Sequence, residues 1–332
     1  MPAAGPLIDS FGRIHSDLRI SVIDRCNIRC FYCMPEEGAE FVPVSRLLSF
    51  AHIERFVNIA RDLGISKIRL TGGEPLLRPR MPDLISRLSR IEGIRDLALT
   101  TNGVLLGNQA KTLFEAGLRR LNVHLDTLDR ERFRTITRRD ELNRVLAGID
   151  EAQRVGFTAV KINAVAIKGL TEPDVLSLVR FGRERSIEVR FIEFMPLDAQ
   201  QIWSLDRVLT ASEMISMLEA EYGRLLPVPD ADPRAPATEY EFSDGYRMGF
   251  IASVSRPFCL NCNRLRLTAD GKLRYCLFAT EETDVRGLLE QADNDAELQE
   301  AIRSNIWQKW IGHEINRPSF VAPSRPMYSI GG

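Results

Sequence analysis

Residues 21–35 read SVIDRCNIRCFYCMP and place Cys26, Cys30 and Cys33 within eight positions. The spacing C-x3-C-x2-C lets one short loop turn three thiolates toward a single point. A structural zinc ion takes four closed protein ligands, and a cubane iron–sulfur cluster normally takes four cysteines, so three thiolates leave one iron free for a small molecule. The loop therefore predicts a metal cluster with an open position.

The composition is that of an ordinary globular protein, with 332 residues, 44% hydrophobic and 27% charged, and a formal net charge of −1. No overall field favours nucleic acid or a membrane, so any anion site must be a local cluster of arginines and lysines. The N-terminal segment has no apolar core of the kind that a secretory signal needs, and nowhere do eighteen apolar residues run uninterrupted. We therefore expect a cytoplasmic protein that neither spans a membrane nor binds nucleic acid.

The six cysteines form two sets of three, and in a reducing cytosol they indicate metal ligands before disulfides. The alternative for the first set is a structural zinc knuckle that a distant side chain completes. None of the four histidines lies at finger-like spacing from the cysteines; they are His15, His52, His124 and His313.

From residue 18 to about 195, short apolar runs of β type alternate with amphipathic helical ones, which predicts βα units and a parallel sheet. Ser49 suits the N-cap of a helix that ends at Leu63, and Gly64 suits its stop. The expected strands are Leu18–Ile23, Lys67–Leu70, Asp96–Thr100, Leu121–Leu125, Val160–Val165 and Glu188–Phe194. The other expected helices are 82–90, 108–116, 141–155 and 172–184.

These six units predict an α/β fold, an incomplete TIM-type barrel whose functional residues lie beyond the carboxyl ends of the strands. After Pro196 the alternation decays into a helix near 210–221, a proline-rich stretch, short strands near 238–243 and 247–254, a helix near 295–311 and an irregular tail. We expect an N-terminal extension (1–16), a partial barrel (17–196) and a smaller α+β domain (197–332).

A glycine pair follows the second expected strand, in Thr71-Gly72-Gly73-Glu74-Pro75. The glycines remove side-chain bulk and permit positive φ, so the backbone can approach a ligand closely, while Glu74 offers a negative charge to an ammonium group. Taken alone, the pair indicates no more than a turn.

Together, the cysteine spacing, Tyr32 before the last cysteine and the Gly-Gly-Glu-Pro strand end resemble the radical S-adenosylmethionine (SAM) superfamily. The resemblance implies a 4Fe–4S cluster on Cys26, Cys30 and Cys33, with the amine and carboxylate of SAM on its free iron. Reductive cleavage of SAM then yields a 5′-deoxyadenosyl radical. The resemblance also implies a cofactor pocket that contains Tyr32, Gly72, Gly73, Glu74 and Met195.

The second set, Cys259-x2-Cys262-x13-Cys276, again supplies three thiolates with no obvious fourth. Arg264 and Arg266 lie between Cys262 and Cys276, in a stretch that alternates as a strand does, and residues two apart on a strand share a face. Each guanidinium fork takes two phosphate oxygens, so the pair suits a polyphosphate. The alternative is a solvated edge strand.

This segment and the terminal Gly331-Gly332 resemble the GTP 3′,8-cyclases of molybdenum cofactor biosynthesis, over nearly the whole chain. The family implies a second 4Fe–4S cluster that meets the purine base of GTP, removal of the ribose 3′ hydrogen by the radical, and attack of that carbon on C8. It also implies an electron donor protein and a downstream cyclic pyranopterin monophosphate synthase. The implied substrate residues are Arg19, Lys67, Arg69, Thr100, Lys161, Arg264 and Arg266.

The Gly331-Gly332 tail has no side chains, so it could thread beside the substrate, and we count it with Arg264 and Arg266 as catalytic. The alternative is plain terminal disorder. The chain departs from the family at His124, where a serine that contacts SAM is common; a histidine is bulkier and titrates near neutrality. We expect His124 to contact SAM, and we expect a monomer or a homodimer.

Two other functions compete with this hypothesis. A peptide-modifying radical maturase with auxiliary clusters could share the C-terminal cysteines, although such regions usually carry more of them. A zinc-stabilised nucleic-acid-binding protein could use the cysteines and arginines, but it predicts a strong basic bias that a net charge of −1 does not show.

Overall fold

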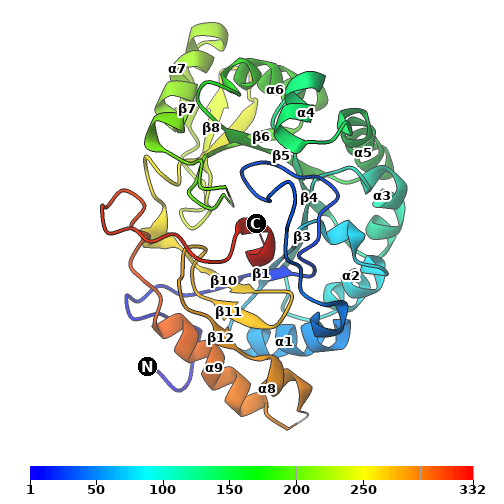
Figure 1. Cartoon of the computed structure of the whole chain (residues 1–332), viewed down its shortest axis with the longest axis vertical. Coiled ribbons are helices and arrows are strands. Elements are labelled where there is room, and N and C mark those ends of the chain that lie inside the picture. Colours follow the sequence, from blue (N-terminus) through cyan, green and yellow to red (C-terminus); the bar gives the residue numbers. More distant parts are fainter. Residues whose placement is uncertain (199, 292, 332) are drawn as a thin grey trace.

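The computed structural model describes residues 1–198, 200–291 and 293–331. Six parallel strands follow one another in sequence order around the molecule, which confirms the predicted α/β fold with its open TIM-type barrel (Figure 1). They are β1 (Asp17–Ser21), β2 (Lys67–Thr71), β3 (Asp96–Thr101), β4 (Arg120–His124), β5 (Ala159–Ala166) and β6 (Glu188–Glu193). Each observed strand begins and ends within one residue or two of its predicted bounds.

Helices cover the outer side of these strands (Figure 1). They include α1 (Phe50–Asp62), α2 (Met81–Ser89), α3 (Leu106–Glu115), α5 (Leu142–Val155) and α6 (Glu172–Arg185). The Ser49 side chain accepts from the His52 N–H at 3.1 Å and caps α1, as predicted. Helix α4 (Arg130–Thr137) was not predicted, because its sequence RERFRTIT carries too few apolar residues for a helical pattern.

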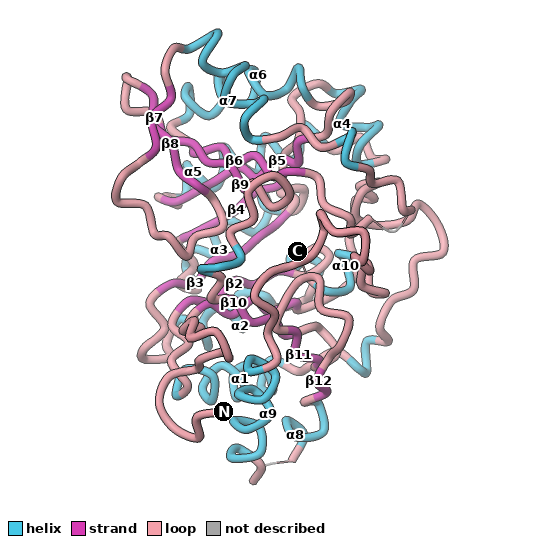
Figure 2. The backbone as a smooth tube through the Cα atoms, turned by 90° about the vertical axis from the view of Figure 1, so that its left-hand side faces the viewer, coloured by secondary structure: helices cyan, strands magenta, loops and turns pink. Residues whose placement is uncertain are grey.

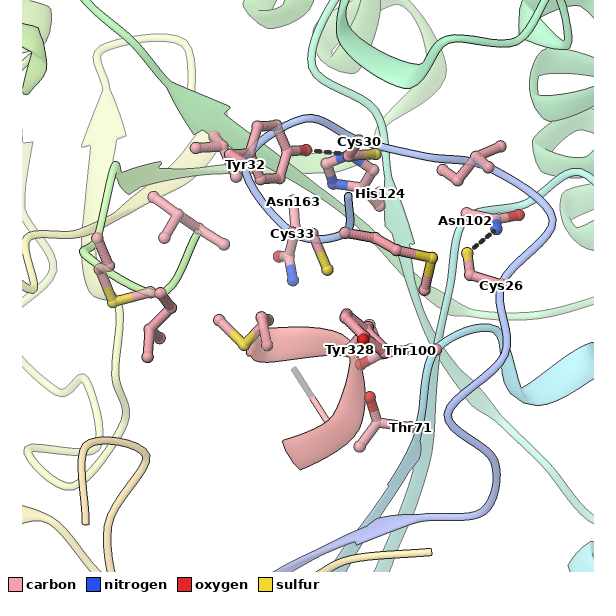
Figure 3. Close-up of a pocket in the computed structure, with 18 of the residues that line it drawn as sticks. Cys26, Cys30, Tyr32, Cys33, Thr71, Thr100, Asn102, His124, Asn163 and Tyr328 are labelled. Atoms are coloured by element: carbon pink, nitrogen blue, oxygen red, sulfur yellow. Dashed lines mark hydrogen bonds between the residues drawn. The ribbon is translucent and has the colours of Figure 1, made fainter. Parts of the chain in front are cut away.

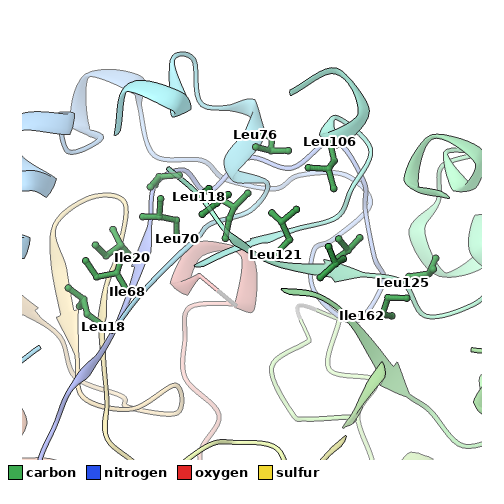
Figure 4. Packing of buried hydrophobic residues seen from close by; sticks show 14 of the residues in the cluster. Leu18, Ile20, Ile68, Leu70, Leu76, Leu106, Leu118, Leu121, Leu125 and Ile162 are labelled. Carbon is green, nitrogen blue, oxygen red and sulfur yellow. The ribbon is translucent and has the colours of Figure 1, made fainter. Parts of the chain in front are cut away.

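The two faces of each barrel strand have different roles. Leu18 and Ile20 on β1, and Ile68 and Leu70 on β2, are buried in the hydrophobic core (Figure 4). Because side chains alternate along a strand, Arg19 on β1 faces the other way, toward the barrel interior. The alternation that the sequence shows thus separates a packing face from an interior that carries charge.

The C-terminal part of the chain extends the barrel sheet at both edges. Strand β9 (Arg247–Ile251) pairs in parallel with β6, and β10 (Arg264–Leu267) pairs in parallel with β1. Antiparallel strands continue the sheet beyond them: β8 (Thr238–Phe242) and β7 (Leu225–Pro227) on one side, β11 (Lys272–Arg274) and β12 (Thr283–Asp284) on the other. The elements after residue 197 therefore complete the wall of the barrel interior.

The remaining helices are α7 (Ala211–Tyr222), α8 (Arg286–Glu290), α9 (Asp295–Trp307) and α10 (Met327–Ile330), with short 3-10 helices at Val44–Arg46, Pro75–Leu77, Leu205–Arg207 and Cys259–Asn261. The tail, expected to be irregular, contains α10 and ends inside the ring of strands (Figures 1 and 2). In the described part of the chain, no helix combines the length and apolar character that a bilayer crossing requires.

Candidate functional site

Two adjoining cavities open inside the barrel, and each contains one set of cysteines. The first cavity is lined by Cys26, Cys30 and Cys33, and the second by Cys259, Cys262 and Cys276. Five residues line both cavities: Thr100, Asn163, Ile192, Met195 and Met327. Ligands in the two cavities would therefore meet across a shared wall.

The first cavity contains one buried and two half-buried thiols. Cys26 lies 3.5 Å from the Asn102 side-chain nitrogen, while Cys30 lies beside His124 (Figure 3). Burial, reinforced by the charge of Glu74, raises the pKa of Cys26 to about 12. Burial likewise raises the pKa of Cys33, which the backbone N–H of Tyr328 partly offsets. Such thiols need a positive partner to deprotonate, and a bound metal supplies one.

The glycine pair allows the end of β2 to pack against the first cysteine loop. A Cβ on Gly73 would lie 2.3 Å from the Arg25 carbonyl oxygen, and one on Gly72 would lie 2.3 Å from that of Ile23. Neither glycine has a positive φ, so the structure corrects the conformational part of the interpretation: close approach of backbone to backbone, rather than φ, requires glycine here.

Glu74 lies behind the first cavity rather than among its lining residues. Its fully buried carboxylate accepts from the Leu76 N–H at 3.0 Å, the Thr101 hydroxyl at 2.7 Å and the Asn102 N–H at 2.7 Å. Burial raises its pKa to about 7, although these hydrogen bonds oppose the shift. In the structure Glu74 positions the end of β3, which carries Asn102; its attraction for an ammonium stays a prediction.

His124, Tyr32 and Asp126 form a hydrogen-bonded group at the wall of the first cavity. The Tyr32 hydroxyl donates to Asp126 at 2.5 Å and lies 2.7 Å from His124 Nε2, which is 3.2 Å from the same carboxylate. Burial lowers the pKa of His124, but the Asp126 carboxylate outweighs burial and raises it well above the ordinary value. The direction of this shift favours the protonated form of His124 at the wall of the first cavity.

The second cavity contains thiols in a positive environment. Arg264 lies 3.2 Å from the Cys262 sulfur, and Lys309 lies nearby. Burial favours the thiol form, but the charges of Arg264 and Lys309 outweigh it and lower the pKa of Cys262 to about 6. Cys262 is therefore a thiolate at neutral pH, the form that ligates iron.

Strand register places three arginines side by side across the second cavity. Arg266 on β10 pairs with Arg19 on β1, which pairs with Arg69 on β2. Burial, together with the neighbouring cations, lowers the pKa of Arg19 and lowers that of Arg266 to about 10. Within the described residues, Nε of Arg19 and both Nε and Nη1 of Arg69 are buried without a hydrogen-bond partner. Clustered cations with free donors fit a multiply charged anion.

Two of the predicted substrate residues lie outside both cavities. Lys67 pairs with Asp232 at 3.3 Å, and Lys161 pairs with Glu188 at 2.5 Å. Their role toward the substrate stays a prediction. Thr100, Arg264 and Met195 line the second cavity.

Several lining residues were missed from the sequence. Arg190 on β6 lines the second cavity, where Glu239 binds it at 2.7 Å. Its position on β6, where side chains alternate between the two faces of the sheet, could have indicated that it faces the interior, as for Arg69 on β2. Lys309 follows α9 and gave no signal, because only the tertiary fold brings it to the cysteines.

The C-terminal tail enters the barrel beside both cavities. The Gly331 carbonyl accepts from Arg266 Nη1 at 2.5 Å, and Gly331 has a φ of 91° and is buried. Gly332, predicted to act with it, lies outside the described residues. Tyr328 lines the first cavity, so the tail is ordered next to the cysteines rather than frayed.

Each cysteine set supplies three thiols to one cavity, a donor set that suits an iron–sulfur cluster. Across the residues that the structure describes, no group of three or more His, Cys, Asp or Glu side chains could hold one metal ion. Each thiol triplet lines one cavity instead, as expected of ligands to a larger cluster, and hydrogen-bond donors such as Asn102 reach the sulfur atoms.

Comparison with known proteins agrees with this arrangement. Residues 20–182 match the Radical SAM superfamily, and residues 187–315 match Molybdenum Cofactor Synthesis C. The chain is 48% identical over 330 residues to a GTP 3′,8-cyclase of Rhodopirellula baltica, covering 98% of this chain and 92% of that protein. The chain belongs to the GTP 3′,8-cyclase family. GTP 3′,8-cyclase 2 of Mycobacterium bovis is 46% identical over 338 residues, which cover 100% of this chain and 94% of that protein.

More distant solved structures share the fold alone. Streptococcus suis SuiB bound to S-adenosylmethionine is 16% identical, with a TM-score of 0.61 and coverage of 90% of this chain and 68% of that one. His-tagged anSMEcpe with bound AdoMet is 13% identical and has a TM-score of 0.57; the match covers 86% of this chain and 79% of that chain. Family membership carries with it a 4Fe–4S cluster and SAM as cofactors.

Proposed function

We propose that this chain is a radical SAM GTP 3′,8-cyclase, a lyase that converts GTP to (8S)-3′,8-cyclo-7,8-dihydroguanosine 5′-triphosphate in the first step of molybdenum cofactor biosynthesis. One observation carries the proposal: the clustered arginines of the second cavity, with buried donors that lack partners, adjoin the first cysteine set. A triphosphate supplies the missing negative charge, and the nucleoside then extends toward the shared wall.

In this proposal the first cavity holds one cluster on Cys26, Cys30 and Cys33, with SAM against the lining residues Tyr32, Gly72, Gly73, His124 and Met195. Glu74, which lies behind the cavity, stays a predicted contact of the SAM ammonium group. The second cavity holds a second 4Fe–4S cluster on Cys259, Cys262 and Cys276. When bound, the first cluster and SAM would supply the 5′-deoxyadenosyl radical chemistry that removes the ribose 3′ hydrogen. Completing the C3′–C8 bond would then take one electron, from the donor protein, and one proton.

The protein contributes charge, position and exclusion of water. Arg19, Arg69 and Arg266 neutralise the triphosphate, with Lys67, Lys161 and Arg264 as further predicted contacts. Thr100, Met195 and Met327 belong to the shared wall and would hold the reacting atoms close together in a dry space. Most of the rate enhancement expected of this site is positional.

The proposal extends to location and partners. The enzyme works in the cytoplasm as a monomer or homodimer, takes electrons from a donor protein and passes its product to cyclic pyranopterin monophosphate synthase. The partial barrel spans residues 17–196, and residues 197–332 form the second-cluster domain.

Iron content after anaerobic purification tests the two-cluster assignment. We expect about eight irons per chain, falling to about four when Cys259, Cys262 and Cys276 are all replaced by serine. About four irons in the unmodified chain, or zinc without iron, would contradict it. Turnover of GTP with SAM and a reductant separates the proposal from a peptide-modifying maturase.

A further inference from the structure

The segment 325–331, which we call the C-terminal strap, starts at a charged contact. Arg325 Nη1 lies 3.0 Å from one Glu282 carboxylate oxygen, and Nη2 lies 3.1 Å from Asp270 Oδ1. The three side chains are only 20%, 20% and 14% exposed. Forked arginine contacts at this degree of burial are stronger than exposed surface ion pairs.

The two carboxylates belong to the part of the chain that builds the second cavity. Asp270 lies in the turn between β10 and β11, and Glu282 lies between Cys276 and β12. Glu282 also binds Arg274 at 2.5 Å, and Arg274 is two residues before Cys276. Arg325 thus joins the strap to the turn of the β10–β11 hairpin and, through Glu282, to Arg274 on β11.

At its other end the strap reaches between the cavities. Gly331 accepts from Arg266, and a Cβ at Gly331 would lie 2.8 Å from Cβ of Ser21. Between these anchors, Met327 lines both cavities and Tyr328 lines the first. A helix of four residues is too short to be stable alone, so the position of α10 depends on its tertiary contacts. Besides the two ends of the strap, these include the Tyr328 side chain, whose hydroxyl donates to the Glu40 carbonyl and whose ring contacts Phe41.

We propose that Arg325 is a positioning residue that latches the C-terminal strap onto Asp270 and Glu282, and so places Met327, Tyr328 and Gly331 between the two cysteine sites. The latch itself requires no bound group. Its consequence for GTP turnover rests on the proposed function.

Hydrogen exchange of the full-length protein, without added cofactor or nucleotide, tests the latch. The N–H groups of Ser329 and Ile330 donate to the Pro326 carbonyl, and that of Gly331 donates to Met327. In Arg325→Met we expect these amides to exchange about tenfold faster, with the barrel strands unchanged, because the strap opens locally. Strap exchange equal to that of the unmodified protein would overturn the proposal.

Three variants separate the latch from general loss of structure. Arg325→Lys keeps one charged contact and should restore most of the protection. Arg317→Met is the matched control, because it removes an exposed arginine whose side chain pairs with Glu314 rather than with the strap. The strap should then exchange as in the unmodified protein, and an equal acceleration there would count against the latch. If Arg325→Met loosens the whole chain, Asp270→Asn is the variant that tests the latch. The asparagine still accepts a hydrogen bond from the Thr268 hydroxyl, but it loses the charge that attracts Arg325.

For Asp270→Asn we expect faster exchange in the strap alone, and no change there would contradict the proposal. These outcomes do not depend on the proposed chemistry. A protein that fails to cyclise GTP but loses strap protection in Arg325→Met would refute the function and leave the latch intact.

Discussion

At the scale of single residues, charge is arranged for ligands rather than for stability. Arg19, Arg69 and Arg266 face one another across neighbouring strands, and burial, together with nearby cations, lowers the pKa values of all three. Clustered cations of this kind destabilise the empty protein. A bound polyanion offsets this destabilisation, because its negative charges neutralise the repulsion between the arginines.

Arg19→Met should therefore weaken GTP binding and strengthen the empty fold. We expect the dissociation constant for GTP to rise about tenfold or more, since a hydrogen bond to a charged group is worth about 1.5–3 kcal/mol. The melting temperature without nucleotide should rise by about 2 °C, as repulsion is relieved. Calorimetric titration and thermal unfolding measure both, with the exposed Arg95→Met as control; unchanged GTP affinity with a lowered melting temperature would refute the assignment.

Glu74 makes the free energy of unfolding depend on pH, and the direction of its pKa shift sets the sign of that dependence. Its pKa in the folded protein is about 7, above the ordinary 4.5, because burial disfavours the carboxylate. Between these values the folded state holds a proton that the unfolded state releases, so this group's contribution to the free energy of unfolding falls as pH rises, by about 3 kcal/mol in total.

Urea unfolding of the unmodified protein and Glu74→Gln at pH 5 and pH 7.5 measures this contribution, because glutamine does not titrate. The free energy of the unmodified protein minus that of the variant should shrink by about 2–3 kcal/mol across this interval. A constant difference would show that Glu74 is ionised throughout.

At the scale of elements, the strand ends bring loops into contact that are distant in sequence. The end of β2 packs backbone to backbone on the first cysteine loop at Gly73, and the end of β3 reaches the same loop through Asn102. The C-terminal strap meets that loop from the opposite end of the chain.

Gly73→Ala tests the contact between β2 and the cysteine loop. The added methyl group would meet three backbone atoms of residues 24 and 25 within 2.6 Å, which cannot move aside as a flexible side chain can. We expect a loss of about 1–3 kcal/mol in the free energy of unfolding, together with reduced iron retention. Gly287→Ala in α8, with no atom within 4 Å of the new Cβ, should leave both unchanged or slightly improved. Equal effects of the two substitutions would argue against the close approach.

The sequence allowed the six barrel strands, their order and the cysteine sites to be predicted, because periodicity and short motifs encode them locally. Helix α4 lacks a clear apolar stripe, and the pairing of β9 and β10 with the two barrel edges depends on contacts far apart in the chain. The positions of Lys309 and Arg325 also have no local signal. The carboxylate partners of Lys67 and Lys161 could not be predicted for the same reason, since they come from other strands and loops.

At the scale of the whole molecule, one continuous sheet surrounds two cysteine sites with a shared wall. The first loop alone indicates a cluster with an open position. Under the proposed function, a radical produced in the first cavity would be released across the shared wall toward a nucleotide held in the second cavity.

Transfer of a single hydrogen between the two cavities tests this central claim most directly. The purified protein would be incubated with SAM, a reductant and GTP that carries deuterium at the ribose 3′ position. We predict 5′-deoxyadenosine that contains one deuterium, together with a cyclised nucleotide that has lost it. Formation of unlabelled 5′-deoxyadenosine with GTP left unchanged would contradict the account.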